Sequence, residues 1–216
     1  NPNTVMVLVN GSPVSINWEN ENIPAILEAW YPGQEGGNAI SDIIFGDYNP
    51  NGKLPITFYK SVNQLPDFYD YDITKGRTYM YLKEKPLYPF GYGLSYTSFE
   101  LSNFSVNKNI FNFKDTIVVS LMIKNTGKLD GSEVVQLYTH HHHSSKYTPL
   151  KKLRSFKKVL LNTNEEKHMK LYVPISSLVA YSLKKKKDYL EEGNYDILLG
   201  TSSENILFKT KINISY

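Results

Sequence analysis

Alternating apolar side chains in the second half of the chain are the feature that most constrains its fold. Within residues 115–125 the alternating positions are Ile117, Val119, Leu121 and Ile123, and the pattern returns later at Tyr195, Ile197, Leu199, Ile206, Phe208, Thr210, Ile212 and Ile214. Successive side chains of a strand point to opposite faces of a sheet. A repeat of two residues therefore predicts strands with one face toward a core.

Several more short strands are expected in the same region. They lie at residues 133–139, 153–161 and 167–173, with turn signals between them. Six or seven short strands in about 120 residues are typical of an immunoglobulin-like or fibronectin type III-like sandwich. Tyr195 follows Glu192-Gly193-Asn194, where such sandwiches often carry a corner tyrosine. Residues 97–216 are therefore predicted to form an all-β sandwich.

The first 60 residues carry short apolar runs between turns instead. Residues 4–9 (TVMVLV) predict a strand that is buried on both faces. We expect a short helix at 25–30, after Pro24, and a second helix at 37–45, ending before Gly46. Another strand is expected at 54–58, after the Asn-Pro-Asn-Gly turn. This order predicts part of an α/β sandwich that is incomplete in this chain.

Residues 61–96 lack a regular repeat and are rich in aromatic side chains. Such a segment is expected to pack over a surface or to rim a cleft. We therefore expect three regions: residues 1–60 as the C-terminal part of an α/β-sandwich domain, 61–96 as a linker and loop, and 97–216 as the β-sandwich.

Composition limits the classes of function. With 41% hydrophobic and 21% charged residues, the chain has the composition of a globular protein. No apolar run approaches the roughly 20 residues that cross a bilayer, and Asn1 leads directly into a strand-like run, so we expect neither a membrane segment nor a signal peptide. The lack of cysteine excludes disulfides, Cys-ligated zinc and thiol catalysis. The net charge of +3 comes without a basic helix interleaved with aromatics, so neither nucleic acid nor membrane is expected as a partner.

Two dense Gly/Pro/aromatic blocks point to a family. They are WYPGQEGGNAISDIIFGDYNPNGKLPITF at 30–58 and PLYPFGYGLSYTSF at 86–99, and GSEVVQLY, LRSFKKVLL and EEGNYDILLGTSS follow at 131–138, 153–161 and 191–203. Glycine and proline fix turns that few other residues can adopt. Through these motifs the chain resembles the C-terminal part of glycoside hydrolase family 3, the β-glucosidase and β-xylosidase family. The resemblance implies the end of an α/β-sandwich domain followed by a fibronectin type III-like domain.

Within that family, LPITFYKSVNQLPDFYDYD at 54–72 together with KGRTYMY at 75–81 is more similar to bacterial β-xylosidases than to typical β-glucosidases. The resemblance thus implies a retaining, exo-acting β-glycosidase that releases xylose from xylo-oligosaccharides. A β-glucosidase of the same family is the first alternative. A non-catalytic carbohydrate-binding or adhesion module built on the sandwich is the second, and it predicts a line of exposed aromatics on one sheet face. Tyr138, Tyr172 and Tyr195 are scattered instead.

The resemblance also implies where catalysis takes place. A retaining glycosidase needs a nucleophile and an acid/base, two carboxyl groups roughly 5 Å apart. In this family the nucleophile is an aspartate of an N-terminal barrel, and the acid/base usually lies upstream of the position of Asn1. We therefore expect no catalytic residue and no cofactor here, and no activity from this chain alone. The implied partners are that barrel and an oligosaccharide, in the periplasm or outside the cell, with self-association left open.

Four residues are candidates for contact with substrate. Trp30 and Tyr31 could stack on a sugar ring, although a Trp at this position is more often part of a core. Glu35 lies at a glycine-rich bend before a helix, where an acidic side chain more often stabilises the helix N-terminus. Asp70 lies with Asp67, Asp72 and two tyrosines on the long loop, where a solvated acidic loop is the alternative.

The run from His140 to His143 raises the question of a metal site, because imidazole is a common metal ligand. Consecutive residues of an extended segment point to alternating sides, so at most two of the four could face one ion. No cysteine or carboxylate beside the run completes a coordination sphere. We therefore expect no metal site.

Overall fold

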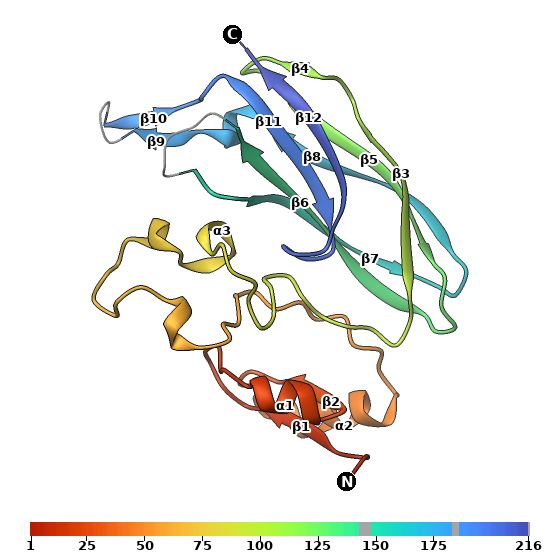
Figure 1. Ribbon diagram of the computed structural model, residues 1–216. Coiled ribbons are helices and arrows are strands. Elements are labelled where there is room, and N and C mark those ends of the chain that lie inside the picture. The colour runs from red at the N-terminus through yellow and green to blue at the C-terminus, as the bar shows by residue number, and fades with distance from the viewer. Residues whose placement is uncertain (143–147, 183–185, 216) are drawn as a thin grey trace.

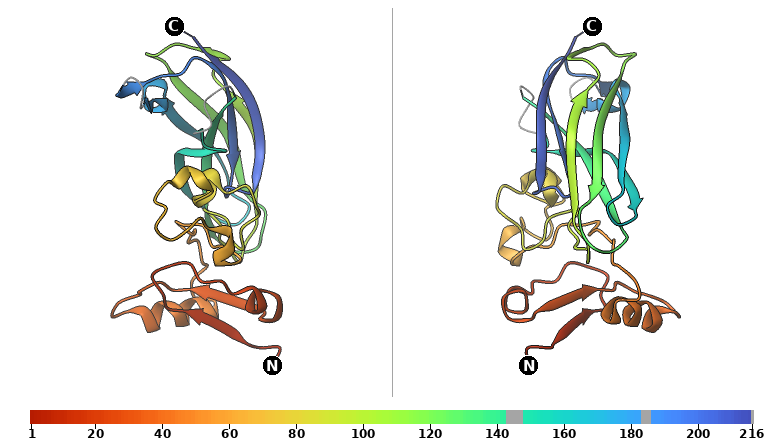
Figure 2. Two further views of the ribbon diagram at one scale, coloured as in Figure 1. Left: turned by 60° about the vertical axis from the view of Figure 1, so that its left-hand side comes forward. Right: turned by 90° about the vertical axis from the view of Figure 1, so that its right-hand side faces the viewer.

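The computed structural model describes residues 1–142, 148–182 and 186–215. Three parts follow one another along the molecule in Figures 1 and 2: a small α/β segment, an irregular linker, and a β-sandwich. The N- and C-termini therefore lie at opposite ends of the molecule (Figure 1). Among the described residues, no helix has the length and apolarity to cross a membrane.

The sandwich consists of two sheets. The larger one has the strand order β4, β12, β11, β6, β7, formed by Ile110–Phe111, Ile206–Ile214, Gly193–Gly200, Gly131–His141 and Lys152–Leu161. The smaller one has the order β3, β5, β8, formed by Phe99–Val106, Thr116–Asn125 and Glu166–Pro174. Neighbouring strands are antiparallel except for β12 and β4. The predicted all-β sandwich is confirmed.

Short elements complete this part of the fold. A hairpin of β9 (Ala180–Ser182) and β10 (Lys187–Tyr189) stands beside the sheets, preceded by a 3-10 turn at Ile175–Leu178 (Figure 1). The sequence analysis named neither this hairpin nor β3 and β4, since short or irregular strands show little alternation. Strand β3, for example, shifts its register against β5 between Ser102 and Ser105.

The core lies between the two sheets and is built by the predicted alternation. Ile117, Val119, Leu121 and Ile123 of β5 are all fully buried, and Ile197 and Leu199 of β11 face them from the larger sheet. The predicted corner tyrosine is also confirmed. Tyr195 is buried, and its hydroxyl donates a hydrogen bond to the Glu191 carbonyl oxygen over 2.7 Å.

Strand β6 is buried on both faces, unlike an ordinary strand of a sandwich. Val135 and Leu137 point into the core, while Gln136 and Tyr138, on the opposite face, are also buried. The linker covers this outer face: Gln136 Nε2 donates to the Gly91 carbonyl oxygen over 3.1 Å, and the Tyr79 ring meets the edge of Tyr138 at 5.9 Å. The linker is thus a packed layer on the sandwich.

The N-terminal segment has the order strand, helix, strand, helix, which corrects one prediction. Its elements are β1 (Val5–Leu8), α1 (Asn17–Asn22), β2 (Ala25–Glu28) and α2 (Gly36–Phe45). The helix predicted at 25–30 is wrong, because Ala25–Glu28 is a strand that pairs in parallel with β1. A run of three apolar residues, Ala25 to Leu27, does not distinguish helix from strand, and pairing with β1 decides the outcome. The predicted second helix is confirmed, with Gly46 in the left-handed region at φ 86°.

The strand predicted at 54–58 is also wrong. This segment runs beside residues 87–92, where Leu54 N donates to Tyr92 O, Gly91 N to Leu54 O and Phe58 N to Tyr88 O. Only one isolated bridge, between Phe58 and Tyr88, is regular enough to count as β-structure. Pro55 and Pro89 interrupt the pairing because proline has no backbone N–H to donate.

The N-terminal segment buries very little of its own surface. Among residues 1–56, all of which the structure describes, only Ile16 and Gly36 are buried. Trp18, Tyr31 and Phe45 are 66%, 76% and 79% exposed. Parallel sheets are usually covered on both faces, and two strands seldom form a stable unit alone. The segment is therefore only part of an α/β layer, as the sequence predicts.

Candidate functional site

The carboxyl ends of the two parallel strands carry two of the four candidate residues, Trp30 and Tyr31. β1 leads into Asn10 and Gly11, while β2 leads into Trp30 and Tyr31. The last ladder partners are Leu8 and Glu28, and Ala29 N still donates to Leu8 O over 2.9 Å. In open α/β sheets ligands bind outside the carboxyl ends of the strands. Trp30 and Tyr31 therefore occupy the edge of the sheet at which binding sites of this architecture form.

Trp30 is half-buried and has an unusual backbone. Its φ of 52° lies in the left-handed region, which a bulky residue rarely adopts. Its N–H donates to Glu28 Oε1 over 3.1 Å, and its ring meets the edge of the buried Phe58 ring at 6.2 Å. The Trp30 side chain thus packs against Phe58 as well as lying at the edge of the sheet.

Tyr31 is presented to solvent, with 76% of its surface exposed. Its ring lies over Gly11: a Cβ atom placed on Gly11 would come within 2.7 Å of Tyr31 Cε2. Glycine at this position therefore lets the loop after β1 approach the aromatic ring. An aromatic ring fixed on one side and open on the other is suited to stacking against a flat ligand.

Glu35 is the residue that precedes helix α2, and it is exposed. Its Oε2 accepts a hydrogen bond from Asn38 Nδ2 over 2.6 Å, but its side chain accepts none from the first N–H groups of the helix. The side-chain cap that the sequence suggested is therefore not formed. The carboxylate lies beside the positive end of the helix and remains accessible.

Asp70 is committed to the structure of its own loop. Its Oδ2 lies 2.5 Å from Lys75 Nζ, its Oδ1 accepts from the Asp72 N–H, and its carbonyl accepts from the Arg77 guanidinium. The hydrogen bond from Lys75 is the main cause that lowers the pKa of Asp70. Among the described residues, no hydrogen bond, ion pair or ring contact joins Asp70 to the segment from Trp30 to Glu35.

The loop around Asp70 presents three aromatic side chains that the sequence analysis did not single out as binding residues. Phe68, Tyr69 and Tyr71 are each 79–81% exposed, and the first two rings meet edge to face at 5.4 Å. Short 3-10 turns at Val62–Gln64 and Ile73–Lys75 flank them. The Asp67 and Asp72 carboxylates accept hydrogen bonds from the N–H groups of Tyr69 and Thr74, which fix the backbone from which the aromatic side chains project.

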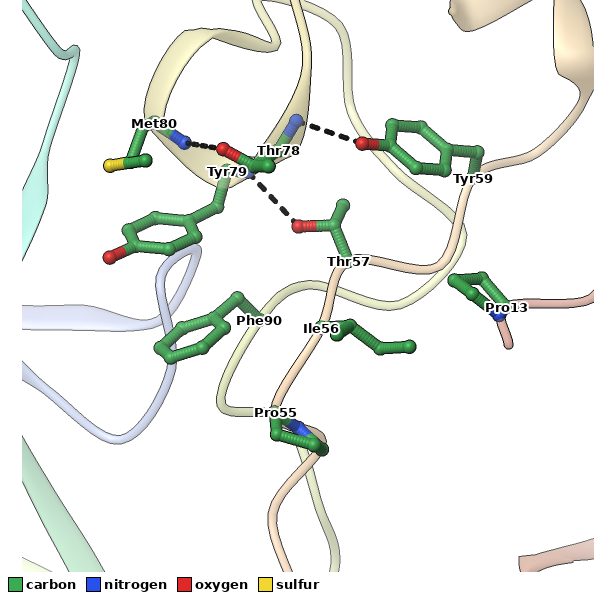
Figure 3. A pocket seen from close by; sticks show the side chains of 9 residues that line it. All are labelled: Pro13, Pro55, Ile56, Thr57, Tyr59, Thr78, Tyr79, Met80 and Phe90. Carbon is green, nitrogen blue, oxygen red and sulfur yellow. Dashed lines mark hydrogen bonds between the residues drawn. The ribbon is translucent and has the colours of Figure 1, made fainter. Parts of the chain in front are cut away.

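Figure 3 shows a pocket of about 280 Å³ between the N-terminal segment and the linker, in which helix α3 (Thr78–Tyr81) forms one wall. Tyr79 N donates to Thr57 Oγ1 and Thr78 N to Tyr59 Oη, while the Tyr79 ring stacks on Phe90 at 4.3 Å. The lining residues are Pro13, Pro55, Ile56, Thr57, Tyr59, Thr78, Tyr79, Met80 and Phe90. This lining is mostly apolar and holds no carboxyl group, so no acid pair faces across the pocket.

The histidine run divides between the two sides of β6, as alternation predicts. The rings of His140 and His142 lie 5.4 Å apart, and His142 Nε2 is 2.8 Å from Asp196 Oδ1. His141 points the other way, where it stacks on Tyr195 and contacts Glu191 Oε2 over 2.9 Å. His143 lies outside the described residues. In the described ranges, no group of three or more histidine or acidic side chains is arranged to hold a metal ion.

One polar residue of this edge was missed by the sequence analysis. Glu28 joins the loops that follow β1 and β2, because its Oε2 accepts from Asn10 Nδ2 over 3.3 Å and its Oε1 accepts from Trp30 N. In the helix expected at 25–30, Glu28 has no position that indicates a binding role. Had 25–28 been assigned as a parallel strand, its position at the carboxyl end would have marked it.

The fold and this edge define a class: the end of an α/β-sandwich domain, joined through a packed linker to a fibronectin type III-like domain. Residues 1–96 match the family model of the glycosyl hydrolase family 3 C-terminal domain, and residues 133–203 match that of the fibronectin type III-like domain. The chain therefore belongs to glycoside hydrolase family 3 and carries its C-terminal part.

Relatives support this assignment over nearly the whole chain. A periplasmic β-glucosidase of Salmonella typhimurium is 38% identical over 94% of the chain, and a xylan 1,4-β-xylosidase of Xylanibacter ruminicola is 41% identical over 92%. The crystal structure of a β-glucosidase from Kluyveromyces marxianus superposes with a TM-score of 0.89 at 37% identity, over 100% of this chain and 27% of that one. The chain spans only 28% and 22% of the first two relatives.

Proposed function

We propose that this chain is the C-terminal portion of a retaining, exo-acting β-glycosidase, and that it supports an active site whose catalytic residues lie outside the chain. The observation that carries this proposal is the match to longer β-glucosidases and β-xylosidases over 92–94% of this chain but only 22–28% of their length. The carboxyl-poor lining of the pocket supports it as well.

The partner of the chain is the N-terminal barrel region of the same enzyme. The support for this is the exposed apolar surface of the α/β segment, on which Trp18 and Phe45 are both mostly exposed. A surface of this kind marks a place where another protein part docks. The role of the segment is positional, because small displacements at a reacting centre lower the rate by large factors. The division of the chain at residues 60 and 96 stays a prediction.

The sugar that we propose as substrate is xylose at the non-reducing end of a xylo-oligosaccharide. The support is the resemblance of residues 54–81 to bacterial β-xylosidases and the 41% identity with the Xylanibacter enzyme. A β-glucosidase is the second candidate, favoured by the identity of 38% with the Salmonella enzyme. That relative is named as a periplasmic enzyme, which supports a periplasmic or extracellular setting.

Trp30, Tyr31 and Glu35 are the residues that we propose to contact the sugar, since all three lie in the segment that connects the carboxyl end of β2 to helix α2. Tyr31 supplies an open aromatic face and Glu35 an accessible acceptor for hydroxyl groups. Asp70 stays a prediction of lower weight, because both of its carboxylate oxygens already have partners within the loop.

A carbohydrate-binding or adhesion module on the sandwich is less well supported. That function requires exposed aromatics in a line on one sheet face. Of the three tyrosines considered for such a face, Tyr138 and Tyr195 are buried and Tyr172 is exposed. The exposed aromatic side chains of the linker, such as Tyr69, lie outside the sandwich.

Two measurements test the proposal. The longer protein that contains this chain is assayed on aryl β-xyloside and aryl β-glucoside, where a higher kcat/KM on the xyloside supports the xylosidase and the reverse supports the glucosidase. The 216-residue chain is titrated calorimetrically with xylobiose, cellobiose and longer xylan fragments. Saturable heat from the chain alone would favour the binding module, and hydrolysis by the chain alone would contradict the placement of the catalytic residues.

A further inference from the structure

We propose that Glu28 is a positioning residue that holds Trp30 in its left-handed backbone conformation and so fixes the Trp30–Tyr31 edge for contact with the sugar. The claim that this edge contacts the sugar rests on the proposed function. The claim that the Trp30 backbone depends on the Glu28 carboxylate rests only on contacts within the chain.

The conformation of Trp30 needs an explanation. At φ 52° an L-residue brings its Cβ close to the following carbonyl oxygen, and among non-glycine residues Asn and Asp tolerate this best. Two of the other non-glycine residues with positive φ, Asn103 and Asn164, are of that kind, whereas Trp30 is bulky. Such strain persists only where surrounding contacts determine the conformation, and it tends to occur at functional sites.

The Glu28 carboxylate supplies those contacts. Its Oε1 accepts the Trp30 N–H over 3.1 Å, and its Oε2 accepts Asn10 Nδ2 over 3.3 Å. Asn10 Nδ2 also donates to the Ser12 carbonyl oxygen over 2.8 Å. One side chain at the end of β2 thus ties down the loops that follow both parallel strands. Hydrogen bonds to an ionised acceptor are stronger than neutral ones, which suits a carboxylate to this role.

The side-chain amide of Asn10 is oriented so that its Nδ2 donates to Glu28. Its Oδ1 is buried and, among the described residues, accepts no hydrogen bond, so both polar contacts of the side chain are made through Nδ2. An unpaired buried acceptor is unfavourable. The structure therefore keeps the contact with Glu28 at the expense of the amide oxygen.

Tyr31 follows Trp30 directly and depends on the same restraint. The hydroxyl end of its ring approaches Gly11, in the loop that Asn10 anchors, and most of its surface is open to solvent. Release of the Trp30 N–H would let both loops move apart and would change the direction of the Tyr31 ring. Both Glu28 oxygens are occupied by donors of the chain itself, so Glu28 acts through Trp30 and Tyr31 and does not touch the sugar.

The experiment uses three variants of the longer protein. Glu28→Ala removes the acceptor, and Glu28→Asp shortens the side chain by one methylene. Glu28→Gln keeps an oxygen that can accept the Trp30 N–H. Glu21→Ala is the matched control, since Glu21 is an exposed carboxylate of α1 whose side chain, among the described residues, makes no hydrogen bond or ion pair with either loop. Hydrogen exchange with mass spectrometry reads a peptide that spans residues 26–36, so that the Trp30 amide lies inside the peptide and keeps its label. We expect exchange at Trp30 to rise about tenfold or more in Glu28→Ala and Glu28→Asp, because a lost acceptor frees the amide for local opening.

Kinetics on a xylo-oligosaccharide supply the second readout. We expect KM to rise about tenfold with kcat little changed in Glu28→Ala and Glu28→Asp, as for a loss of binding shared by ground and transition state, and Glu28→Gln to retain most of the affinity. Unchanged exchange at Trp30 overturns the positioning role. Raised exchange with unchanged KM overturns the link to the sugar. An inactive unsubstituted enzyme contradicts the proposed function, and hydrogen exchange still decides the role of Glu28.

Discussion

Lys53 Nζ lies 2.8 Å from Glu133 Oε1, and both side chains are only 11% exposed. Lys53 Nζ also donates to the Gly93 carbonyl oxygen over 2.7 Å, so one ammonium group connects the end of the N-terminal segment, the linker and strand β6. Nearby, Asn49 Nδ2 donates to the Asp130 carbonyl oxygen, and Asn49 Oδ1 accepts from the Tyr96 N–H. The three parts of the chain are therefore joined by specific polar contacts.

Replacement of this lysine tests how firmly the parts are joined. In Lys53→Met the Glu133 carboxylate would stay nearly buried without its partner, which costs about 3 kcal/mol of unfolding free energy. Lys75→Met is the control, because the Lys75–Asp70 pair is far more exposed and surface pairs contribute little. Urea unfolding followed by far-UV circular dichroism measures both. Equal stability of the two variants would contradict a structural role for the Lys53–Glu133 pair.

The sequence determined the sandwich well and the N-terminal segment only in part. Ile117 to Ile123 show the alternation of a strand with one buried face, and the structure confirms it. Ala25–Glu28 gave no such pattern, since a short strand of a parallel sheet is apolar on both faces and is ambiguous with a helix. The strand expected at residues 54–58 does not form, because the effect of Pro55 on pairing depends on a partner distant in the sequence, residues 87–92.

In the candidate site too, local sequence patterns could be predicted, whereas contacts between distant segments could not. Trp30 and Tyr31 were predicted from local composition, and the structure places them together at the edge of the parallel pair. Glu28 could not be recognised, because its role depends on Asn10, a residue of the other strand's loop. Asp70 was predicted as a binding residue from an acidic and aromatic loop, but its contacts with Lys75 and Arg77 depend on how that loop folds.

Gly91 is expected to tolerate no side chain. Its φ is 81°, and a Cβ atom would lie 2.1 Å from Gln136 Oε1, which belongs to the buried outer face of β6. In Gly91→Ala, backbone strain and displacement of Gln136 together should lower the unfolding free energy by about 3 kcal/mol. Gly37→Ala is the matched control, because nothing lies within 4 Å of its Cβ position and alanine favours a helix. Thermal unfolding should show a lower Tm for Gly91→Ala and an equal or higher Tm for Gly37→Ala.

The corner tyrosine offers a test of the sandwich alone. Tyr195→Phe keeps the ring that stacks on His141 but removes the hydroxyl that donates to the Glu191 carbonyl oxygen. We expect a loss of about 1 kcal/mol in unfolding free energy, the usual net contribution of one hydrogen bond. Tyr172→Phe, at an exposed position of β8, should leave the stability unchanged. A loss of the same size in both variants would show that the hydroxyl of Tyr195 has no special role.

Asp196 is expected to make the stability of the sandwich depend on pH. Asp196 is nearly buried, with Oδ2 2.7 Å from Lys209 Nζ and Oδ1 2.8 Å from His142 Nε2. Burial acts to raise the pKa of Asp196, but the contacts with Lys209 and His142 outweigh it, so that this pKa is lowered from 3.8. A carboxylate with a lowered pKa in the folded state stabilises the protein above its unfolded pKa, and this contribution is lost as the pH falls from about 3.8 through the lower folded value.

Asp196→Asn should therefore reduce stability near pH 7, by about 2 kcal/mol for the lost charged hydrogen bonds, and should flatten the decline of stability below pH 3.8. Unfolding free energies measured in half-unit steps from pH 3 to pH 7 give both quantities. Asp188→Asn, at an exposed position of β10, is the control and should follow the unsubstituted protein throughout. Asp70, Asp115 and Glu165 also have lowered pKa values and stay in every variant, so only the difference between curves reports Asp196. Parallel curves for Asp196→Asn and the unsubstituted protein would mean that Asp196 has the same pKa when folded and unfolded.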